Sequence, residues 1–519
     1  MKRSKIYLVL LLLPLMVACF SDETTDAVNP LSTIVVESGI ESVYNIGKND
    51  QIVIEPVISQ KNKKKTLYYT WEVDLEKKDS AATFTFVGQS LGKYNCRFIV
   101  ENEDGKTFVP FTINVNSPYE EGITVLSKDA NGKSMLSFMQ KPYGNEKGEF
   151  YNYDCFAVNN PDYDFAAGAV DLAQCRDSYG SGGWVIIACQ GGGEENDPPT
   201  IYYLNEKTFE VENFVSVPEY EDFKPVKMGL QPTVYKQTSY PILCENGKVY
   251  DFSIGEADVV EPRKLQSTYA QSCVVTNSSV GYEILLYDKA NKGLSLIYNG
   301  YGPYYCSKKK FHLMLGDENF KKYNYFSNRD LVAMTNIRMT EEQIAKAGKR
   351  NELLIITSSY SVMARSEVIY SDFWGYNSME TEEELKYPVT TQYSHEGQWD
   401  SERCPLTPET PCIANQTYET FFFADGNKVR VWKYSALPSD MEGLMNAGVF
   451  CEVGSADAIV TGFEMSDDHK KTYVAFYEPK KEGLNGSVWV FDTDSKDGKP
   501  LEKYDNISYQ PVKMIYKKK

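Results

Sequence analysis

Short apolar runs recur in pairs along most of the chain, each pair divided by a polar turn or a short insertion. The first runs of seven pairs begin near residues 123, 184, 242, 284, 353, 420 and 473, and their partners are expected at 135–138, 201–204, 248–252, 294–298, 367–370, 429–432 and 488–491. The mean step of about 58 residues exceeds the ~40–50 residues of a lean propeller blade, so insertions are needed. The pattern predicts an all-β chain in which residues 120–519 form a β-propeller of seven blades.

The end of the chain carries a sign of repetition. Pro225-Val226-Lys227-Met228 recurs as Pro511-Val512-Lys513-Met514. We expect the final strand to pair with the first hairpin, because this pairing would close the ring and leave only short, protected edges.

Few segments of this region have a helical pattern. Thr340 and Gln343 are spaced as in a capping box, and Gly348 marks a helix stop. A second short helix is expected at 378–386, and 159–179 is expected to be a loop or a short helix.

Residues 31–116 show a different pattern, in which apolar and polar residues alternate over short strands separated by polar turns. In the segment after Gly92, the side chains of Tyr94, Cys96, Phe98 and Val100 are expected on one face, because strand side chains alternate. The order Gly92, Tyr94, Cys96, with Trp71 earlier, resembles an immunoglobulin-like sandwich of seven strands, in which a Trp fills the core and a Tyr pins a corner. With its Asn-x-Asp-Gly turn, the segment also resembles PKD-like domains. An unrelated small β domain is the alternative.

The N-terminus has the features of an export signal. Residues 1–18 combine a basic start with an apolar run that is too short to span a membrane. The run ends at Ala18-Cys19, which resembles a lipobox, although Met16 stands where Leu is usual. The resemblance implies that Cys19 is the lipid anchor, whereas the alternative is an ordinary secretory signal. Residues 19–30 are expected to form an acidic tether, and the acidic residues directly after Cys19 resemble the surface-export signals of Sus-type lipoproteins. A plain solvated tether is the alternative.

The composition and net charge of the chain argue against several classes of function. Lys and Arg number 54 against 72 Asp and Glu, for a formal net charge of −18. This acidic balance argues against nucleic acid as a partner. Only three His are present, and none of the 11 Cys forms a Cys-x-x-Cys pair, so zinc knuckles and thioredoxin chemistry are not expected. Cys404 and Cys412 flank a Pro-rich loop and could form a disulfide in an exported protein.

Several segments resemble motifs of catalysis or metal binding, but each lacks a residue or a spacing that the motif requires. His395-Glu396 begins like a zinc-protease helix, but Trp399 replaces the second His. The acidic segment 492–498 is spaced wrongly for a calcium loop and reads as a turn between strands. Gly191 to Gly193 lacks the Gly-Lys-Ser/Thr of a phosphate loop. We therefore predict no catalytic residue, no metal site and no cofactor, and no pair of carboxylates stands out among the 72 acids.

Aromatic residues concentrate in two predicted loops, where flat rings could stack on sugars or peptide side chains. The candidate ligand-binding residues are Tyr298, Tyr301, Tyr304, Tyr305, Trp374 and Tyr376. Packing in the core or rim is the alternative role for these rings.

Taken in order, the lipid anchor, the PKD-like domain and the Tyr-rich hairpins resemble the PKD-like family lipoproteins that accompany SusC/SusD-type outer-membrane uptake systems. The resemblance implies a lipid-anchored protein of the outer membrane that faces the cell exterior and binds a glycan or peptide beside such a transporter, without catalysis. A surface propeller enzyme, a glycosidase or lyase, and a purely structural scaffold of the uptake complex are the alternatives.

Overall fold

The computed structural model describes residues 30–140, 151–177, 182–192, 197–216, 223–230, 233–234, 239–253, 259–260, 270–278, 281–288, 293–298, 330–348, 350–358, 360–367, 389–435 and 441–518. Contacts divide the chain into two compact units, Met1–Pro118 and Tyr119–Lys519. Strands dominate both, and the described residues include three short helices, α2 (Cys155–Asn159), α4 (Glu341–Ala347) and α5 (Glu442–Met445). The prediction of an all-β chain is confirmed.

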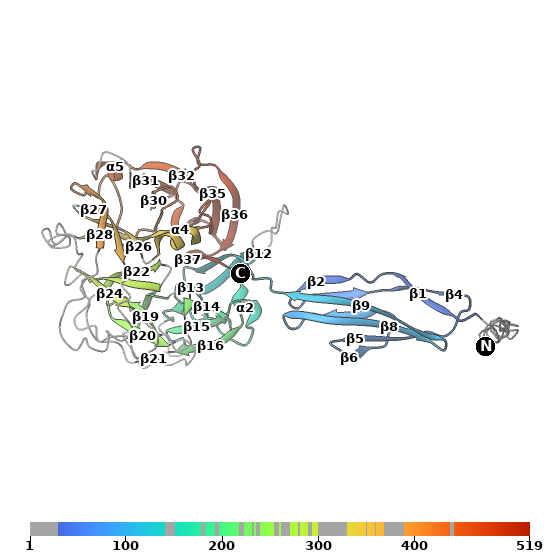
Figure 1. Cartoon of the computed structure of the whole chain (residues 1–519). Helices are drawn as coiled ribbons and strands as arrows, with labels where there is room; N and C mark the ends of the chain where they lie inside the picture. The colour runs from blue at the N-terminus through green and yellow to red at the C-terminus, as the bar shows by residue number, and fades with distance from the viewer. Residues whose placement is uncertain are drawn as a thin grey trace, which may run out of the picture. The chain divides into compact units, whose positions relative to one another are not determined.

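The first unit consists of antiparallel strands with one parallel pair (Figure 1). A five-stranded sheet has the order β2 (Val43–Gly47), β9 (Gly105–Asn116), β8 (Gly92–Asn102), β5 (Tyr68–Val73) and β6 (Glu76–Asp79), with β2 and β9 parallel. Two further pairs join β1 (Thr33–Ser38) to β4 (Val57–Lys61) and β3 (Gln51–Ile54) to β7 (Phe84–Val87).

Trp71 is the centre of the core of the first unit. Its side chain is fully buried, and its indole nitrogen donates to the Ala81 carbonyl at 2.9 Å. Cys96, Phe98 and Val100 of β8 are buried, as the alternation in the sequence predicts. Tyr94 on the same face is half-buried, and its hydroxyl donates to the Ser90 carbonyl at 2.8 Å, which fixes the turn before β8.

The second unit consists of successive antiparallel sheets, mostly of four strands (Figure 1). In chain order, the first three groups of strands are β10 (Gly122–Lys128), β11 (Ser134–Gln140) and β12 (Tyr151–Asn152); β13 (Ala169–Asp177), β14 (Gly183–Cys189), β15 (Thr200–Asn205) and β16 (Val211–Ser216); and β17 (Pro225–Met228), β19 (Ser239–Cys244), β20 (Val249–Ser253) and β21 (Val259–Val260). The next two groups are β22 (Ala270–Ser278), β23 (Gly281–Asp288) and β24 (Gly293–Tyr298); and β25 (Leu331–Arg338), β26 (Arg350–Thr357), β27 (Tyr360–Glu367) and β28 (Val389–Glu396). The last two groups are β29 (Cys412–Asn415), β30 (Thr420–Asp425), β31 (Lys428–Lys433) and β32 (Gly448–Glu452); and β33 (Ile459–Met465), β34 (Lys471–Tyr477), β35 (Gly486–Asp492) and β36 (Pro500–Ser508).

Two short parallel pairings add to these sheets. β18 (Thr233–Val234) pairs with the end of β13, and β25 pairs with β29 over two residues, which makes one eight-stranded sheet of two successive groups.

The last strand, β37 (Gln510–Lys517), pairs antiparallel with β10 of the first sheet. β37 also contacts β33 of the last group and β13 of the second, so the two ends of the unit meet. Apolar clusters lie between neighbouring sheets, as where Leu126 and Phe138 pack with Leu172 and Val185. Sheets that pack face to face in a closed circle form a β-propeller. The predicted propeller and the predicted closure by the final strand are both confirmed.

The predicted hairpins pair in six of the seven cases, as β10–β11, β14–β15, β19–β20, β23–β24, β30–β31 and β34–β35. The fifth is wrong in its second strand, which was expected at 367–370. A short turn after Thr357 returns the chain at once, so β26 pairs with β27, which ends at Glu367.

Among the interruptions, α4 begins with the predicted capping box of Thr340 and Gln343 and ends at Gly348. The expectation of a loop or helix over 159–179 is wrong for its second half, because residues 169–177 form β13. The helix expected at 378–386 lies outside the described residues. The segment 492–498 is a turn between β35 and β36, as predicted, with Gly498 at φ +61°.

Cys404 and Cys412 are free thiols, so the disulfide that the sequence allows is not formed. Cys404 is fully buried and packs in the same apolar cluster as Phe421 and Met441. It therefore acts as a small apolar residue.

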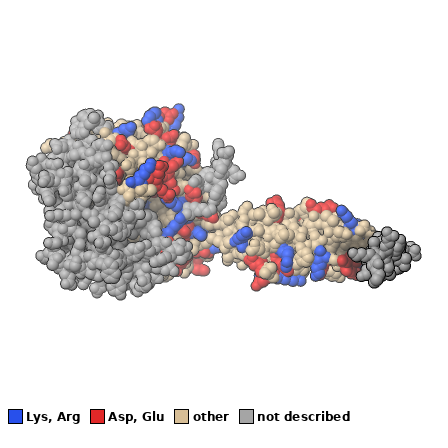
Figure 2. Space-filling model, viewed as in Figure 1, with Lys and Arg blue, Asp and Glu red and all other residues tan. Residues whose placement is uncertain are grey.

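Acidic and basic side chains are interspersed over the described surface in the view of Figure 2. Many make ion pairs, such as Lys471 with Glu502 and Lys480 with Asp457, each at 2.9 Å. Exposed pairs of this kind add little to stability, about 0–1 kcal/mol each. The described surface in this view has no continuous basic face.

Candidate functional site

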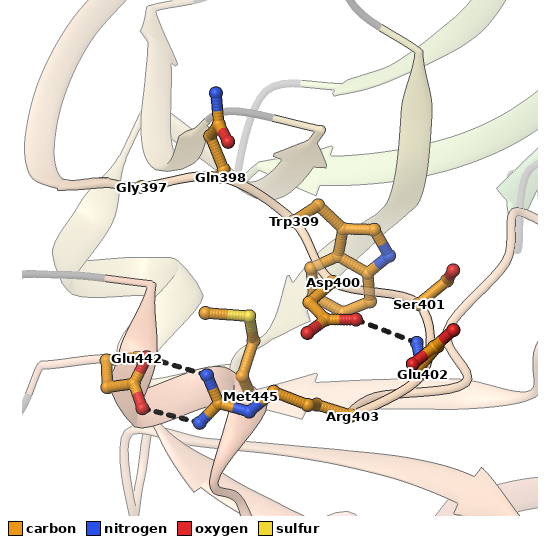
Figure 3. A pocket seen from close by; sticks show the side chains of 9 residues that line it. All are labelled: Gly397, Gln398, Trp399, Asp400, Ser401, Glu402, Arg403, Glu442 and Met445. Carbon is orange, nitrogen blue, oxygen red and sulfur yellow. Dashed lines mark hydrogen bonds and ion pairs between the residues drawn. The ribbon is translucent and has the colours of Figure 1, made fainter.

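An open cleft of 740 Å³ lies beside the segment that connects β28 to β29 (Figure 3). Its walls come from residues 397–403 of this segment and from Glu442 and Met445 of α5. Figure 3 shows Trp399 and Asp400 on one side, the Arg403–Glu442 pair on the other, and the Met445 side chain between them.

Local hydrogen bonds hold the connecting segment in place. The Trp399 amide donates to the Ser358 carbonyl at 2.9 Å, which ties the segment to the turn between β26 and β27. The Asp400 carboxylate accepts from the Glu402 amide at 3.0 Å, and the Asp400 carbonyl accepts from the Cys404 amide at 3.1 Å. An Asp that accepts from the backbone two residues on is a typical turn former. Trp399 is therefore presented on an ordered turn.

Arg403 crosses from this turn to α5. Its guanidinium donates to both carboxylate oxygens of Glu442, at 3.0 Å for the Nη1–Oε2 pair, and to the Asn446 side-chain oxygen at 2.7 Å. The hydrogen bonds from Arg403 and then Asn446 lower the pKa of Glu442 to about 2. Glu442 therefore stays ionised at any physiological pH, and its charge is matched by Arg403.

The remaining groups define what the cleft can bind. Trp399 is half-buried and packs on the apolar cluster of Phe421 and Met441, so its position is fixed while part of its ring is exposed. Asp400 and Glu402 lie within the same short turn, and the ion pair of Arg403 is with Glu442 and not with either of them. An aromatic face beside carboxylate acceptors suits a ligand that has an apolar face and hydroxyl or amine donors.

The residues predicted from the sequence as ligand contacts are described only in part. Tyr298 is the last residue of β24, and its side chain is not described. Tyr301, Tyr304, Tyr305, Trp374 and Tyr376 lie outside the described residues, as does Cys19. These assignments stay predictions.

The cleft was not predicted. In the sequence, Trp399 stands out only as the residue that breaks a zinc motif, and Arg403 and Glu442 are 39 positions apart with no pattern that links them. Within the described ranges no cluster of His, Cys, Asp and Glu could hold a metal ion, and no helix is both long and apolar enough to cross a membrane.

His469 is the one His whose side chain is described, and it lies in the turn between β33 and β34. It is almost fully buried, and its Nδ1 is hydrogen-bonded to the Thr417 hydroxyl at 2.9 Å. Burial, and next the nearby Arg338, lower the pKa of His469 to about 4. The imidazole is therefore neutral at neutral pH and has a structural role.

This shift predicts a loss of stability in mild acid. The unfolded chain takes up a proton at His469 near pH 6.5, whereas the folded chain resists it down to about pH 4. The contribution is complete above pH 6.5 and decreases as the pH falls, by about 2 kcal/mol at pH 5. His469→Asn should unfold with a smaller difference between pH 7 and pH 5 in urea titrations, and Asn tolerates the φ of +59° found here. An unchanged pH dependence in the variant would contradict this assignment.

No protein-family model and no curated protein matches the chain. Among solved structures it is similar to a quinonprotein alcohol dehydrogenase-like protein from Bacteroides thetaiotaomicron, with 12% identity and a TM-score of 0.44 over 94% of this chain and 99% of the other. It is also similar to the Swd1 β-propeller domain of Myceliophthora thermophila (7% identity, TM-score 0.35, 65% and 88% covered) and to Sqt1 of Saccharomyces cerevisiae (9%, 0.40, 75% and 86%). The assignment of the second unit as a β-propeller rests on the strand pairing described above.

Proposed function

We propose that this protein is a lipid-anchored binding protein of the outer-membrane surface, which captures a glycan at its propeller without turning it over. The observation that carries the proposal is the cleft at Trp399, where an ordered, half-buried indole lies beside the carboxylates of Asp400 and Glu402. Sugar rings stack their apolar face on indoles, and their hydroxyls donate to carboxylates. Weak single sites of this kind become effective by avidity when many copies are displayed on one membrane.

The first unit supports this role as an immunoglobulin-like, PKD-like spacer between anchor and propeller. Supporting observations are the buried Trp71, the Tyr94 hydrogen bond to the backbone four residues earlier, and the strand order of the five-stranded sheet with its parallel first pair. These are features of immunoglobulin-like sandwiches.

For the second unit we propose seven blades. The supporting observations are the grouping of its strands into successive antiparallel sets and the short, two-residue pairing that links β25 to β29. Because this pairing covers only two residues, we interpret the eight-stranded sheet as two blades.

The anchor is tested by Cys19→Ser, with Ser21→Ala as a matched control. A single membrane signal at Cys19 predicts that the serine variant moves from the membrane fraction to the soluble fraction, because a thioether to the lipid can no longer form. The control should stay with the membranes. Sedimentation of the Cys19→Ser variant with membranes in high salt would show that another segment holds the protein.

Ligand capture is tested on glycan arrays with a soluble form that begins after Cys19. Trp399→Ala should weaken glycan binding by about tenfold or more, because the stacking face is lost, while the melting temperature should fall no further than in a variant that truncates another half-buried indole. Trp489→Ala is the matched control, since this indole is also half-buried but lies on β35. Equal binding by the wild type and Trp399→Ala would place the site elsewhere, with the Tyr298–Tyr305 and 372–376 segments as the next candidates.

The proposed partner is a SusC/SusD-like transporter, and co-purification from outer membranes is the direct test. Capture of a transporter of this class by the wild-type protein would support the assignment. Multiple turnovers of a polysaccharide by the purified protein would instead support a surface enzyme.

A further inference from the structure

Among the strands at the inner edges of the propeller sheets, all but β29, which pairs with β30 in regular register, share one irregularity. β13, β17, β22, β25, β33 and β37 each contain a β-bulge near their start, with Val170, Val226, Gln271, Val332, Thr461 and Val512 as the extra residues. These strands also contact one another in sequence around the unit, as β33 with β37, β37 with β13, and β13 with β17. Bulges are enriched at sheet edges and next to active sites, where they re-aim a side chain or end the strand pairing.

The residue that follows each bulge differs in charge and size from one side of the circle to the other. Charged residues follow on three neighbouring strands, as Lys513, Asp171 and Lys227 of β37, β13 and β17. Small residues follow on the others, as Ser272, Ala333 and Gly462 of β22, β25 and β33. Charged residues therefore stand after the bulges on one side of the circle, and small residues stand after those on the other.

Asp171 has its charge satisfied by the surrounding strands. Its buried carboxylate accepts from the Met228 amide at 2.7 Å and from the Leu172 amide at 3.0 Å, and lies 3.8 Å from the Lys513 ammonium. Lys513 keeps a side-chain exposure of 39% in this pair. The three groups together leave one positive charge in excess, that of Lys227.

No carboxylate of the described residues lies within ion-pair distance of Lys227. Its ammonium acts on a strand that is not its neighbour: it favours the thiolate of Cys412 on β29, against the burial that raises the pKa of this thiol to about 12. Around the circle, β29 is separated from β17 by β22 and β25 in one direction and by β13, β37 and β33 in the other. Lys227 follows the bulge of β17 as Lys513 follows the bulge of β37, and both strands contact β13, so the two lysines occupy equivalent positions on either side of Asp171. The action of Lys227 on Cys412 agrees with a side chain directed inward.

The opposite side has room. A Cβ at Gly462 would meet only the Ala475 Cβ, at 3.9 Å, and Gly462 does not have the positive φ that would require glycine. Ala333 is small and buried at the equivalent position. A glycine that neither its backbone conformation nor its neighbours demand leaves space beside the inner strand β33.

We propose that Lys227 and Lys513, presented by the two Pro-Val-Lys-Met repeats, form a binding site for a small anion, a carboxylate or a phosphate, at the axis of the propeller. The bulges aim the lysines, Asp171 fixes Lys513, and the small residues opposite leave room for the ligand. This site is separate from the Trp399 cleft, so it can hold the acidic group of a sugar or a free anion whether or not the cleft binds a glycan.

Titration calorimetry on the soluble chain tests the site with two probes, glucuronate and inorganic phosphate, at constant ionic strength set with chloride. We expect saturable binding of at least one probe, and the preferred probe identifies a carboxylate or a phosphate as the ligand. Lys227→Met should weaken this binding about tenfold or more, because a charge-assisted hydrogen bond is lost. Gly462→Leu should weaken it by filling the space opposite.

Lys480→Met is the matched control, because this lysine is highly exposed and pairs with Asp457 outside the inner strands. It should bind the anion as the wild type does. Melting curves of all variants identify any that fails to fold, and Gly462→Leu then supplies a second, uncharged test beside Lys227→Met. The proposal is overturned if neither probe binds, or if well-folded Lys227→Met and Gly462→Leu both bind like the wild type.

Discussion

Trp71→Ala is expected to destabilise the first unit by about 3–5 kcal/mol, the range found for truncating a fully buried large aromatic ring. The indole packs against Phe98 with ring centroids 4.2 Å apart and against Phe84 at 5.0 Å, and Phe111 meets it edge-on at 6.1 Å. The variant loses these contacts together, and it leaves the Ala81 carbonyl without its donor. A unit of about 90 ordered residues has a total stability of only about 5–15 kcal/mol, so this loss is a large part of it.

Hydrogen exchange measured on the intact protein is the suitable readout, because the propeller can obscure unfolding of a smaller unit. Peptides from β8 and β9 should exchange at least 100-fold faster in Trp71→Ala, as each 1.4 kcal/mol changes the opening equilibrium tenfold. Tyr68→Ala is the control on the same strand, since this ring is 59% exposed. Similar protection in both variants would mean that the rings around Trp71 do not hold this sheet together.

The central strands of the sheets could be predicted from the sequence because they are buried on both faces. β14 and β30 are apolar and buried along nearly their whole length, so they stand out as runs such as Trp184 to Cys189. The inner strands could not be recognised in this way. β13 carries Asp171, Gln174 and Arg176, and its bulge breaks the alternation that identifies a strand.

One signal of the inner strands was nevertheless present in the sequence. The repeated Pro-Val-Lys-Met marks β17 and β37, and in both copies the Val is the bulged residue. Related tetrapeptides begin the bulged part of other inner strands, as Ala169-Val170-Asp171-Leu172 and Leu331-Val332-Ala333-Met334. These four segments share a small or apolar residue, a β-branched residue, any residue and then Leu or Met, whereas the bulges of β22 and β33 depart from this pattern.

The Trp399 cleft has no such signal. Its chemistry depends on the Arg403–Glu442 pair, which joins a connecting segment to a helix of four residues. Neither segment has a periodic pattern, and their approach is decided by packing of Leu444 and Met441 against Phe421. Contacts between irregular segments follow from the assembled fold, so local sequence does not predict them.

The largest effect in the second unit is expected for Met514→Asp. Met514 of β37 is buried and packs with Ile123 and Val125 of the first sheet and with Val488 of the last, so one apolar cluster joins the two ends of the propeller. An unpaired carboxylate in this cluster would cost several kcal/mol. Because β37 also supplies the backbone partners of β10, its release would leave the first sheet with an open edge.

Leu501→Asp provides the matched control, because it introduces the same charge on the adjacent strand β36, where Leu501 is 55% exposed. Met514→Asp should lower the melting temperature and make the propeller sensitive to proteolysis, whereas Leu501→Asp should behave like the wild type. A ring that is closed by its last strand has no other way to cover β10, so the loss should spread through the whole unit and not remain in the first sheet. Equal melting temperatures for the two variants would contradict closure by β37, and intact sheets beyond the first in Met514→Asp would show that the propeller unfolds one sheet at a time.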